Sequence, residues 1–344
     1  MGIGKEKAPL CSVCCLSYKH SKFIRQNIES IWNQTYDNIE IIALDDGSPD
    51  GSSRVLKELK NKSPWPMKVI AQKNSGNIAK NMNILLSSAT GKYIVLVACD
   101  DKLYEDTIRS KIDLMEKNDN VVFVVSKKHY EIGENDTIIK EDNAEYLASK
   151  INNADELLNI EYEKTHTFFI QNAVFRKQII DEVGGFDEDL LGDDIVLRVK
   201  IFLHMQKNPE LSFKVSNDIG FFYRIHENNI HKNSSRQIKL IAQVLERYFP
   251  DRETPRLFKN WIRSYVELLP FEENIQLLFL SPKCSNTFSL LDKETQDFIM
   301  KKIQRPRTFD FFSLYMTKSP GKRSVYLGIF GKRLKLFGIK KRRK

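Results

Sequence analysis

The sequence lacks any long apolar run. No stretch of about 18 consecutive apolar residues occurs among its 344 residues, so no transmembrane helix is predicted. The segment Met1–Lys7 also lacks the apolar core of a secretion signal. These absences predict a globular, cytoplasmic protein. Its length suits one large domain or two smaller ones.

Cysteine is scarce and odd in number, which argues against a disulfide framework. Cys11 and Cys14 have the Cys-x-x-Cys spacing, but no second pair and no His-x-x-x-His segment completes four zinc ligands. Three of the five cysteines fall in an apolar stretch that is typical of a buried strand. Free thiols packed within a strand are therefore the better interpretation.

Acidic residues are missing from residues 311–344, whereas residues 318–344 hold eleven Lys or Arg. The formal charge of +9 thus belongs to this tail, and the rest of the chain is slightly acidic. A nucleic-acid partner would need a basic patch on the folded domain, so none is expected. Apolar and basic residues interleave over 326–337, which predicts peripheral binding of 318–344 to the anionic inner face of the cytoplasmic membrane. A solvated basic end is the alternative.

Apolar runs alternate with helical patterns over the first 130 residues. The expected strands are Leu10–Leu16, Ile39–Leu44, Met67–Ala71, Tyr93–Val97 and Val121–Val125. Helices are expected after Ser21, after Ser52, and over Asn77–Ser88 and about Asp106–Lys117. This alternation predicts an α/β fold with a mainly parallel sheet that helices cover on both faces. Ligands of such sheets bind beyond the carboxyl ends of the strands.

The later segments are predicted from weaker patterns. Residues 127–165 are polar, and we expect them to form an irregular excursion over the active-site face before Phe168–Phe175 resumes the core. Beyond Gly220 the pattern turns helical. The candidate helices there are Arg236–Tyr248, Pro255–Leu269, Glu272–Leu280 and Asp292–Ile303.

Two pairs of acids directly follow predicted strands. Asp45 and Asp46 lead into Gly47, and a carboxylate there can accept hydrogen bonds from a nucleobase or a ribose. An ordinary polar turn is the alternative. Asp100 and Asp101 also follow a strand, and their oxygen atoms suit Mg²⁺ or Mn²⁺ bridged to a diphosphate. Capping of the next helix is the alternative.

A third pair, Asp193 and Asp194, precedes the amphipathic stretch Ile195–Met205. A carboxylate at the start of a helix can take the proton of an acceptor hydroxyl, while helix capping is the simpler role. Arg224 and His226 form a fourth element, whose guanidinium and imidazole can meet a departing diphosphate. No role is predicted for the other histidines, which are His20, His129, His166, His204 and His231.

The order of these motifs resembles glycosyltransferase family 2, which comprises inverting enzymes with the GT-A fold. Residues 30–36, Ser-Ile-Trp-Asn-Gln-Thr-Tyr, resemble the family's Ser-x-x-x-Gln-Thr-Tyr segment, and Asp-Asp-Gly-Ser follows at the expected distance. Residues 74–81 resemble its Asn-x-Gly-x-x-x-Ala-Arg-Asn stretch, with Lys80 in place of the commoner Arg and one residue fewer. We therefore expect a Rossmann-like GT-A nucleotide-binding domain over 1–230, a helical C-terminal region over 231–310 and a basic amphipathic tail over 311–344.

The resemblance implies roles for the acids. Asp45 and Asp46 would bind the base and the ribose, and Asp100 would ligate the metal. Asp194 would be the base that deprotonates the acceptor, with Asp193 as the runner-up. The implied donor is a nucleotide sugar, first of all a UDP-sugar, and the implied acceptor is a glycan or a lipid-linked oligosaccharide in surface-polysaccharide synthesis.

Cations are expected around the leaving diphosphate. Lys80 and Arg224 would contact its phosphates, and His226 would join Asp100 at the metal. One departure from the family matters: Ala98 replaces the first acid of the Asp-x-Asp motif, so its contacts must come from neighbouring acids, water or the phosphates. A nucleotidyltransferase and a catalytically inactive nucleotide-binding or membrane-associated protein are the competing hypotheses.

Overall fold

The computed structural model falls into two compact units, Met1–Leu257 and Phe258–Lys344. It describes residues 8–143, 151–191, 194–227, 229, 234–268, 297, 313–319, 322–329 and 332–340. The division at residue 257 falls inside the predicted helical region 231–310, and the predicted three-part division stays a prediction.

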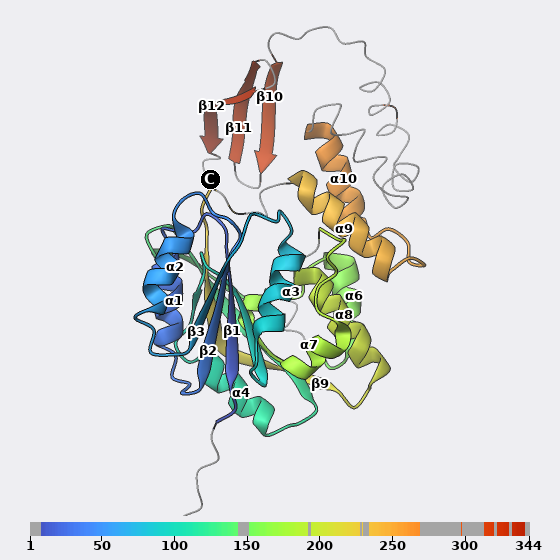
Figure 1. The fold of residues 1–344 in the computed structure, drawn as a ribbon. Coiled ribbons are helices and arrows are strands. Elements are labelled where there is room, and N and C mark those ends of the chain that lie inside the picture. The colour runs from blue at the N-terminus through green and yellow to red at the C-terminus, as the bar shows by residue number, and fades with distance from the viewer. Residues whose placement is uncertain are drawn as a thin grey trace, which may run out of the picture. The chain divides into compact units, whose positions relative to one another are not determined.

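A nine-stranded sheet forms the centre of the first unit (Figure 1). The strand order is β3-β2-β1-β4-β8-β6-β9-β5, and β7 pairs with β6. The strands are β1 (Cys11–Ser17), β2 (Ile39–Asp45), β3 (Met67–Ala71), β4 (Tyr93–Ala98), β5 (Lys102–Leu103), β6 (Val121–Ile132), β7 (Ile138–Asn143), β8 (Ala173–Arg176) and β9 (Ser212–Arg224). Strands β1 to β4 pair in parallel with one another, as does β6 with β9, whereas β5, β7 and β8 pair antiparallel. The predicted α/β fold with a mainly parallel sheet is confirmed.

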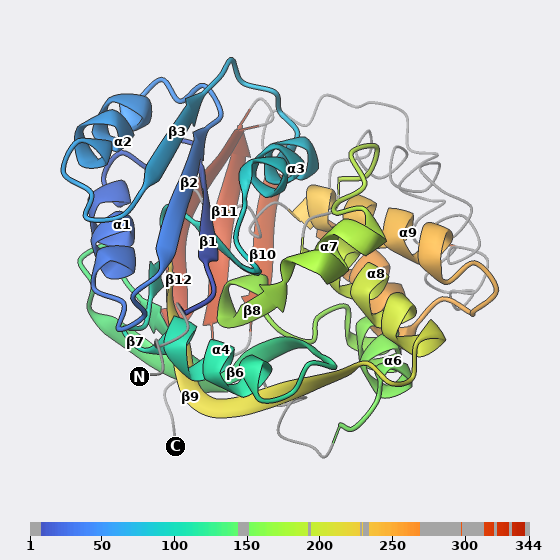
Figure 2. The same ribbon diagram turned by 60° about the horizontal axis from the view of Figure 1, so that its bottom comes forward.

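Helices lie on both sides of this sheet. They are α1 (Ile24–Trp32), α2 (Ser52–Lys60), α3 (Ile78–Ser88), α4 (Thr107–Glu116), α6 (Ala154–Lys164), α7 (Lys177–Val183), α8 (Asp194–Lys207) and α9 (Ser234–Tyr248), with a short 3₁₀ turn over Ile170–Asn172. Figures 1 and 2 show α1 and α2 on one side of β1–β3 and α3 on the other. The four helices predicted before residue 120 are therefore confirmed.

One apolar cluster joins the sheet to α1, α2 and α4. Its fully buried members include Val13 of β1, Ile28, Leu56 and Ile112. Because burying such a side chain stabilises the fold by about 1.5–3 kcal/mol, this cluster fixes where the carboxyl ends of β1, β2 and β4 lie. Cys11, Cys14, Cys15 and Cys99 are free and buried, which confirms the free-thiol interpretation for these four; Cys284 lies outside the described residues.

Two segments correct the prediction. Residues 127–143 are not irregular, because β6 continues to Ile132 and β7 returns beside it, and α6 follows. The extended chain also does not turn helical at Gly220, since β9 pairs with β6 as far as Arg224. The far end of β6 is largely polar, so pairing with β7 and β9, and not an apolar pattern, defines the strand there.

The last described elements belong wholly or mainly to the second unit. Helix α10 (Arg256–Leu268) confirms the predicted helix over 255–269, whereas those over 272–280 and 292–303 lie outside the described residues, apart from Asp297. Strands β10 (Ser313–Ser319), β11 (Lys322–Ile329) and β12 (Lys332–Lys340) form an antiparallel sheet. Within the described part of the chain, no helix is long and apolar enough to cross a membrane.

Candidate active site

The loop that follows β1 is held by the loop that follows β2. Three consecutive backbone N–H groups, those of residues 19–21, donate to the side chains of Ser48, Ser52 and Asp50 at 2.9, 3.1 and 3.0 Å. Asp50 in turn accepts from the Ser52 hydroxyl at 2.6 Å. These bonds fix the chain at the carboxyl end of β1, where a parallel sheet binds its ligands.

Asp45 and Asp46 lie at the carboxyl end of β2, and both are buried. The Asp45 carboxylate accepts from the N–H and the hydroxyl of Ser48 at 3.1 and 2.5 Å. Asp46 accepts from Gln72 and from the N–H of Ser75, each at 2.8 Å. Burial raises the pKa of Asp46, but these hydrogen bonds outweigh burial and hold that pKa below its usual value. The contacts of both acids with a base and a ribose stay a prediction.

Gly47 allows this turn to approach β3 closely. Its φ is +70°, and a Cβ atom at this position would lie 2.4 Å from the backbone nitrogen of Asn74. A side chain is therefore excluded by both the backbone conformation and the lack of space.

Asp100 lies just beyond the carboxyl end of β4, between two imidazoles. Its Oδ2 is 3.0 Å from Nε2 of His226 and 3.5 Å from Nε2 of His20. Its Oδ1 is buried without a hydrogen-bond partner among the described residues. The three side chains offer ligand atoms within 4.8 Å of one another, and carboxylate oxygen and imidazole nitrogen both bind divalent metals. The residues present therefore fit the metal that the sequence predicts.

Two contacts hold His226 in place. Its backbone N–H donates to Oδ1 of Asn229 at 2.6 Å, and its ring packs against Phe23 with a centroid distance of 5.3 Å. Burial raises the pKa of Asp100, but His20 and His226 outweigh burial and keep that pKa below its usual value. The Asp100 carboxyl group is thus ionised at neutral pH, as a metal ligand must be.

His20 received no role from sequence, yet the structure places its Nε2 atom 3.5 Å from Oδ2 of Asp100. Burial lowers the pKa of His20, and Asp100, Asp50 and Asp45 act against that shift, so all three carboxylates lie around the imidazole. The parallel pairing of β1 with β4 explains its position, because residues just beyond two paired parallel strands share one edge of the sheet.

Arg224 is occupied by contacts within the protein, and its predicted contact with a diphosphate stays a prediction. The side chain is fully buried, and it donates to the carbonyls of Asp100 and Gly133 at 2.8 and 2.9 Å. Its guanidinium also lies 2.7 Å from Oδ1 of Asp136, and its backbone N–H donates to Asp101 at 2.9 Å. These bonds from Arg224 hold the turn after β6 against the segment that contains Asp100.

We expect Arg224→Met to destabilise the protein by about 3–5 kcal/mol, because it leaves buried carbonyls without a donor and removes one of the two cations, Arg224 and Lys102, beside Asp136. Urea unfolding measures this loss. Arg54→Met is the matched control, since Arg54 makes only an exposed ion pair with Glu58 and should cost under about 1 kcal/mol. Equal stability of the two variants would contradict the structural role of Arg224.

Asp194 is the first residue of α8, and its side chain is 24% exposed. Its Oδ2 accepts from the N–H of Ile170 at 3.4 Å and lies 3.8 Å from the guanidinium of Arg198. Asp193 lies outside the described residues. Lys80 is exposed on the first turn of α3, and its contact with donor phosphates stays a prediction.

Tyr223 on β9 links the second and third acid pairs. Burial raises the pKa of Tyr223, and the charges of Asp101, Asp100 and Asp194 raise it further. Coulombic effects of this kind fall off with distance, so these acids lie around one ring. Burial, followed by the charge of Asp100, also raises the pKa of Asp101. The first acid pair is linked to the loop that carries His20, because the Ser48 hydroxyl donates to Asp45 and accepts from the N–H of Lys19.

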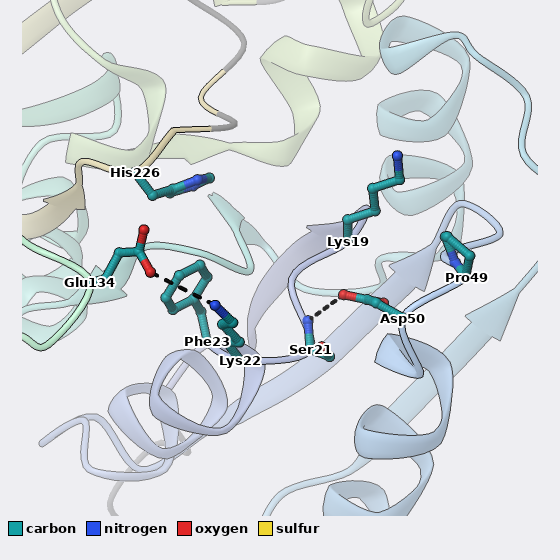
Figure 3. Close-up of a pocket in the computed structure, with 8 residues that line it drawn as sticks. All are labelled: Lys19, Ser21, Lys22, Phe23, Pro49, Asp50, Glu134 and His226. Carbon is teal, nitrogen blue, oxygen red and sulfur yellow. Dashed lines mark hydrogen bonds and ion pairs between the residues drawn. The ribbon is translucent and has the colours of Figure 1, made fainter.

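A cavity of about 400 Å³ adjoins this group (Figure 3). It is lined by Lys19, Ser21, Lys22, Phe23, Pro49, Asp50, Glu134 and His226. His226 belongs to both the cavity wall and the cluster around Asp100, so a ligand in the cavity can reach a metal held by that cluster.

Comparison with known proteins decides the family. A family model described as Glycosyl transferase family 2 matches residues 12–184, about half of the chain. The chain belongs to glycosyltransferase family 2. Over 179 residues it is 29% identical to the minor teichoic acid biosynthesis protein GgaA of Bacillus subtilis, covering 50% of this chain and 38% of that protein. The chain spans about two fifths of the length of the most similar curated relatives that it matches.

Solved structures of two glycosyltransferases share the fold of this family 2 chain. S. aureus TarS 1-349 in complex with UDP-GlcNAc has a TM-score of 0.54 and 15% identity, with 96% of this chain and 100% of that chain covered. The mannosyltransferase PcManGT from Pyrobaculum calidifontis, solved with GDP-Man and Mn²⁺, has a TM-score of 0.52 and 15% identity, with 86% and 80% covered. The GT-A-type fold implied by the sequence is therefore confirmed.

Proposed function

We propose that this family 2 glycosyltransferase moves a sugar from a UDP-sugar to a hydroxyl group of a glycan or lipid-linked acceptor, with inversion and with a divalent metal. The observation that carries the proposal is the cluster of His20, Asp100 and His226 beyond β4. The Asp45 carboxylate is linked through the Ser48 hydroxyl to the loop that carries His20. The UDP-GlcNAc complex of TarS and the Mn²⁺ complex of PcManGT support the donor and the metal. The teichoic acid role in the name of GgaA supports a surface-polysaccharide acceptor.

The acceptor side depends on Asp194. Its partial exposure leaves it accessible to a hydroxyl group, and its place at the start of α8 keeps the carboxylate ionised. Arg198, 3.8 Å away, adds a positive charge that does the same. Asp194 can therefore accept the hydroxyl proton as the oxygen attacks the anomeric carbon.

The donor side depends on the ends of β1, β2 and β4. The Asp45–Asp46 turn would hold the nucleoside, and Asp100 and His226 would hold the metal beside its diphosphate. When bound, a divalent ion supplies positive charge to the departing diphosphate. A single displacement, with the acceptor opposite the leaving group, inverts the anomeric configuration.

Product analysis tests this function. The full chain is incubated with UDP-sugars, Mn²⁺ and glycan or polyol-phosphate acceptors, and we expect free UDP together with a product of inverted anomeric configuration by NMR. Release of pyrophosphate would establish a nucleotidyltransferase instead. Absence of turnover across a complete panel of donors and acceptors would contradict the proposal and favour an inactive binding protein.

We further propose that the C-terminal segment brings the enzyme to an anionic membrane surface, because residues 318–344 carry eleven cationic side chains and no acid. Deletion of 318–344 should lower cosedimentation with phosphatidylserine-containing vesicles at least about tenfold, since each Lys or Arg near such a surface contributes about 1 kcal/mol. Loss of the difference in high salt would show that binding is electrostatic. Equal sedimentation of both proteins would contradict this role.

A further inference from the structure

Two groups of side chains within the described ranges have the composition and spacing of a metal site. One is His20, Asp100 and His226, and the other is His129, Glu131 and Asp142 on β6 and β7. In the second group a cation is already present, because Nζ of Lys140 lies 2.7 Å from Oδ2 of Asp142. The first group is therefore the better candidate for a metal site.

The spacing within the first group fits coordination of one ion. Ligand atoms about 2.1 Å from a common ion stand about 3.0 Å apart at octahedral angles and about 3.4 Å apart at tetrahedral angles. Oδ2 of Asp100 is 3.0 Å from Nε2 of His226 and 3.5 Å from Nε2 of His20. One ion can thus contact all three side chains without a large rearrangement.

Unpartnered polar atoms point to the same conclusion. Oδ1 of Asp100 and Nδ1 of His20 are both buried without a hydrogen-bond partner among the described residues. Burying polar atoms without partners costs free energy, which a ligand, an ion or water usually offsets. The site is therefore suited to bind an occupant. Nδ1 of His20 would then donate to a ligand or water while Nε2 binds the ion.

His20 also stands where a ligand is missing. Ala98 offers no donor atom at the position of the first acid in the Asp-x-Asp motif, and Leu16 at the end of β1 pairs with it directly. The chain beyond Leu16 leads to His20, whose backbone N–H is fixed by Ser52. A side chain from the loop after the neighbouring strand is thus available as a ligand where Ala98 offers none.

We propose that His20 is a metal ligand of this enzyme, and that the resulting set of two imidazoles and one carboxylate selects Mn²⁺ over Mg²⁺. Imidazole nitrogen suits transition metals, whereas Mg²⁺ favours oxygen ligands. The inference rests on the proposed function, because it concerns the metal that would serve sugar transfer. Beyond that function, it names His20 as a metal ligand and Mn²⁺ as the preferred metal.

Binding of Mn²⁺ to the full chain tests the inference without measuring activity. After chelator treatment, the protein is titrated with MnCl₂, alone and with UDP, and free Mn²⁺ is followed by electron paramagnetic resonance. We expect Mn²⁺ to bind at least about tenfold more tightly than Mg²⁺. His20→Ala should weaken Mn²⁺ binding about 10–100-fold and remove one ¹⁴N coupling from the pulsed spectrum of bound Mn²⁺.

Two further variants separate the alternatives. His20→Asp replaces nitrogen with oxygen, and we expect it to bind Mg²⁺ more tightly than wild type and to lose most of the Mn²⁺ preference. Asp142→Asn removes a carboxylate from the second group and should bind Mn²⁺ as wild type does. Wild-type Mn²⁺ affinity and ¹⁴N coupling in His20→Ala, or loss of binding in Asp142→Asn, would overturn the inference.

The two proposals fail in different ways. Sugar transfer measured on the same samples reports the proposed function, whereas the ¹⁴N coupling reports only the ligand. Nitrogen coupling from His20 without transfer would reject the function and keep the metal site. Metal-dependent transfer in which His20→Ala changes neither Mn²⁺ affinity nor coupling would reject the ligand and keep the function.

Discussion

Asp194→Asn should lower the turnover number of sugar transfer about 10³-fold and leave UDP affinity within about twofold. General-base catalysis contributes about 10²–10⁴-fold to a rate, and an amide cannot accept the hydroxyl proton. Asp194 is assigned to the acceptor side of the site and the Asp45–Asp46 turn to the nucleoside, so donor binding should persist. Turnover is measured by UDP release, and affinity by calorimetry.

The matched control for this substitution is Asp181→Asn. Asp181 lies on α7 and makes an ion pair with Lys177 at 2.6 Å on the helix surface. Its replacement by Asn should leave turnover unchanged. Near wild-type turnover in Asp194→Asn would mean that another group, first of all Asp193, takes the proton.

Asp100→Asn should weaken Mn²⁺-dependent UDP binding at least about 30-fold, which corresponds to about 2 kcal/mol. The carboxylate would be the anionic ligand of the set, and an amide is a much poorer ligand for a divalent cation. Calorimetric titration with UDP, with and without Mn²⁺, measures the loss. Without metal, UDP affinity should be the same in wild type and variant.

Asp113→Asn on the exposed face of α4 controls for the change in net charge. It should bind UDP as the wild type does in both conditions. Unchanged metal dependence in Asp100→Asn would remove Asp100 from the metal site, and His20 and His226 with it.

The donor half of the site was predictable because its signals are local. Each of β2 and β4 is a continuous apolar run that ends beside an acid, and the rule for parallel sheets places those ends at one edge. The sequence alone therefore predicts Asp45 and Asp100 at the same edge of the sheet. Asp194 was found from the start of an amphipathic helix, a signal of the same local kind.

The missed features depend on long-range contacts. His20 lies in a polar loop without periodicity, and only the pairing of β1 with β4 and the contacts with Ser52 place it beside Asp100. Arg224 resembles a phosphate ligand in sequence, yet the turn after β6 covers it with backbone carbonyls. No local pattern indicates that this turn returns to the end of β9.

A crystal structure of the full chain with Mn²⁺ and UDP, with the metal located by its anomalous scattering, tests the common site of the three acid pairs most directly. We expect one Mn²⁺ peak at ligand distance from Asp100 and His226, the uridine against the Asp45–Asp46 turn, and Asp194 facing the open end of the diphosphate. A manganese peak away from Asp100, or a nucleotide on another face of the sheet, would contradict it.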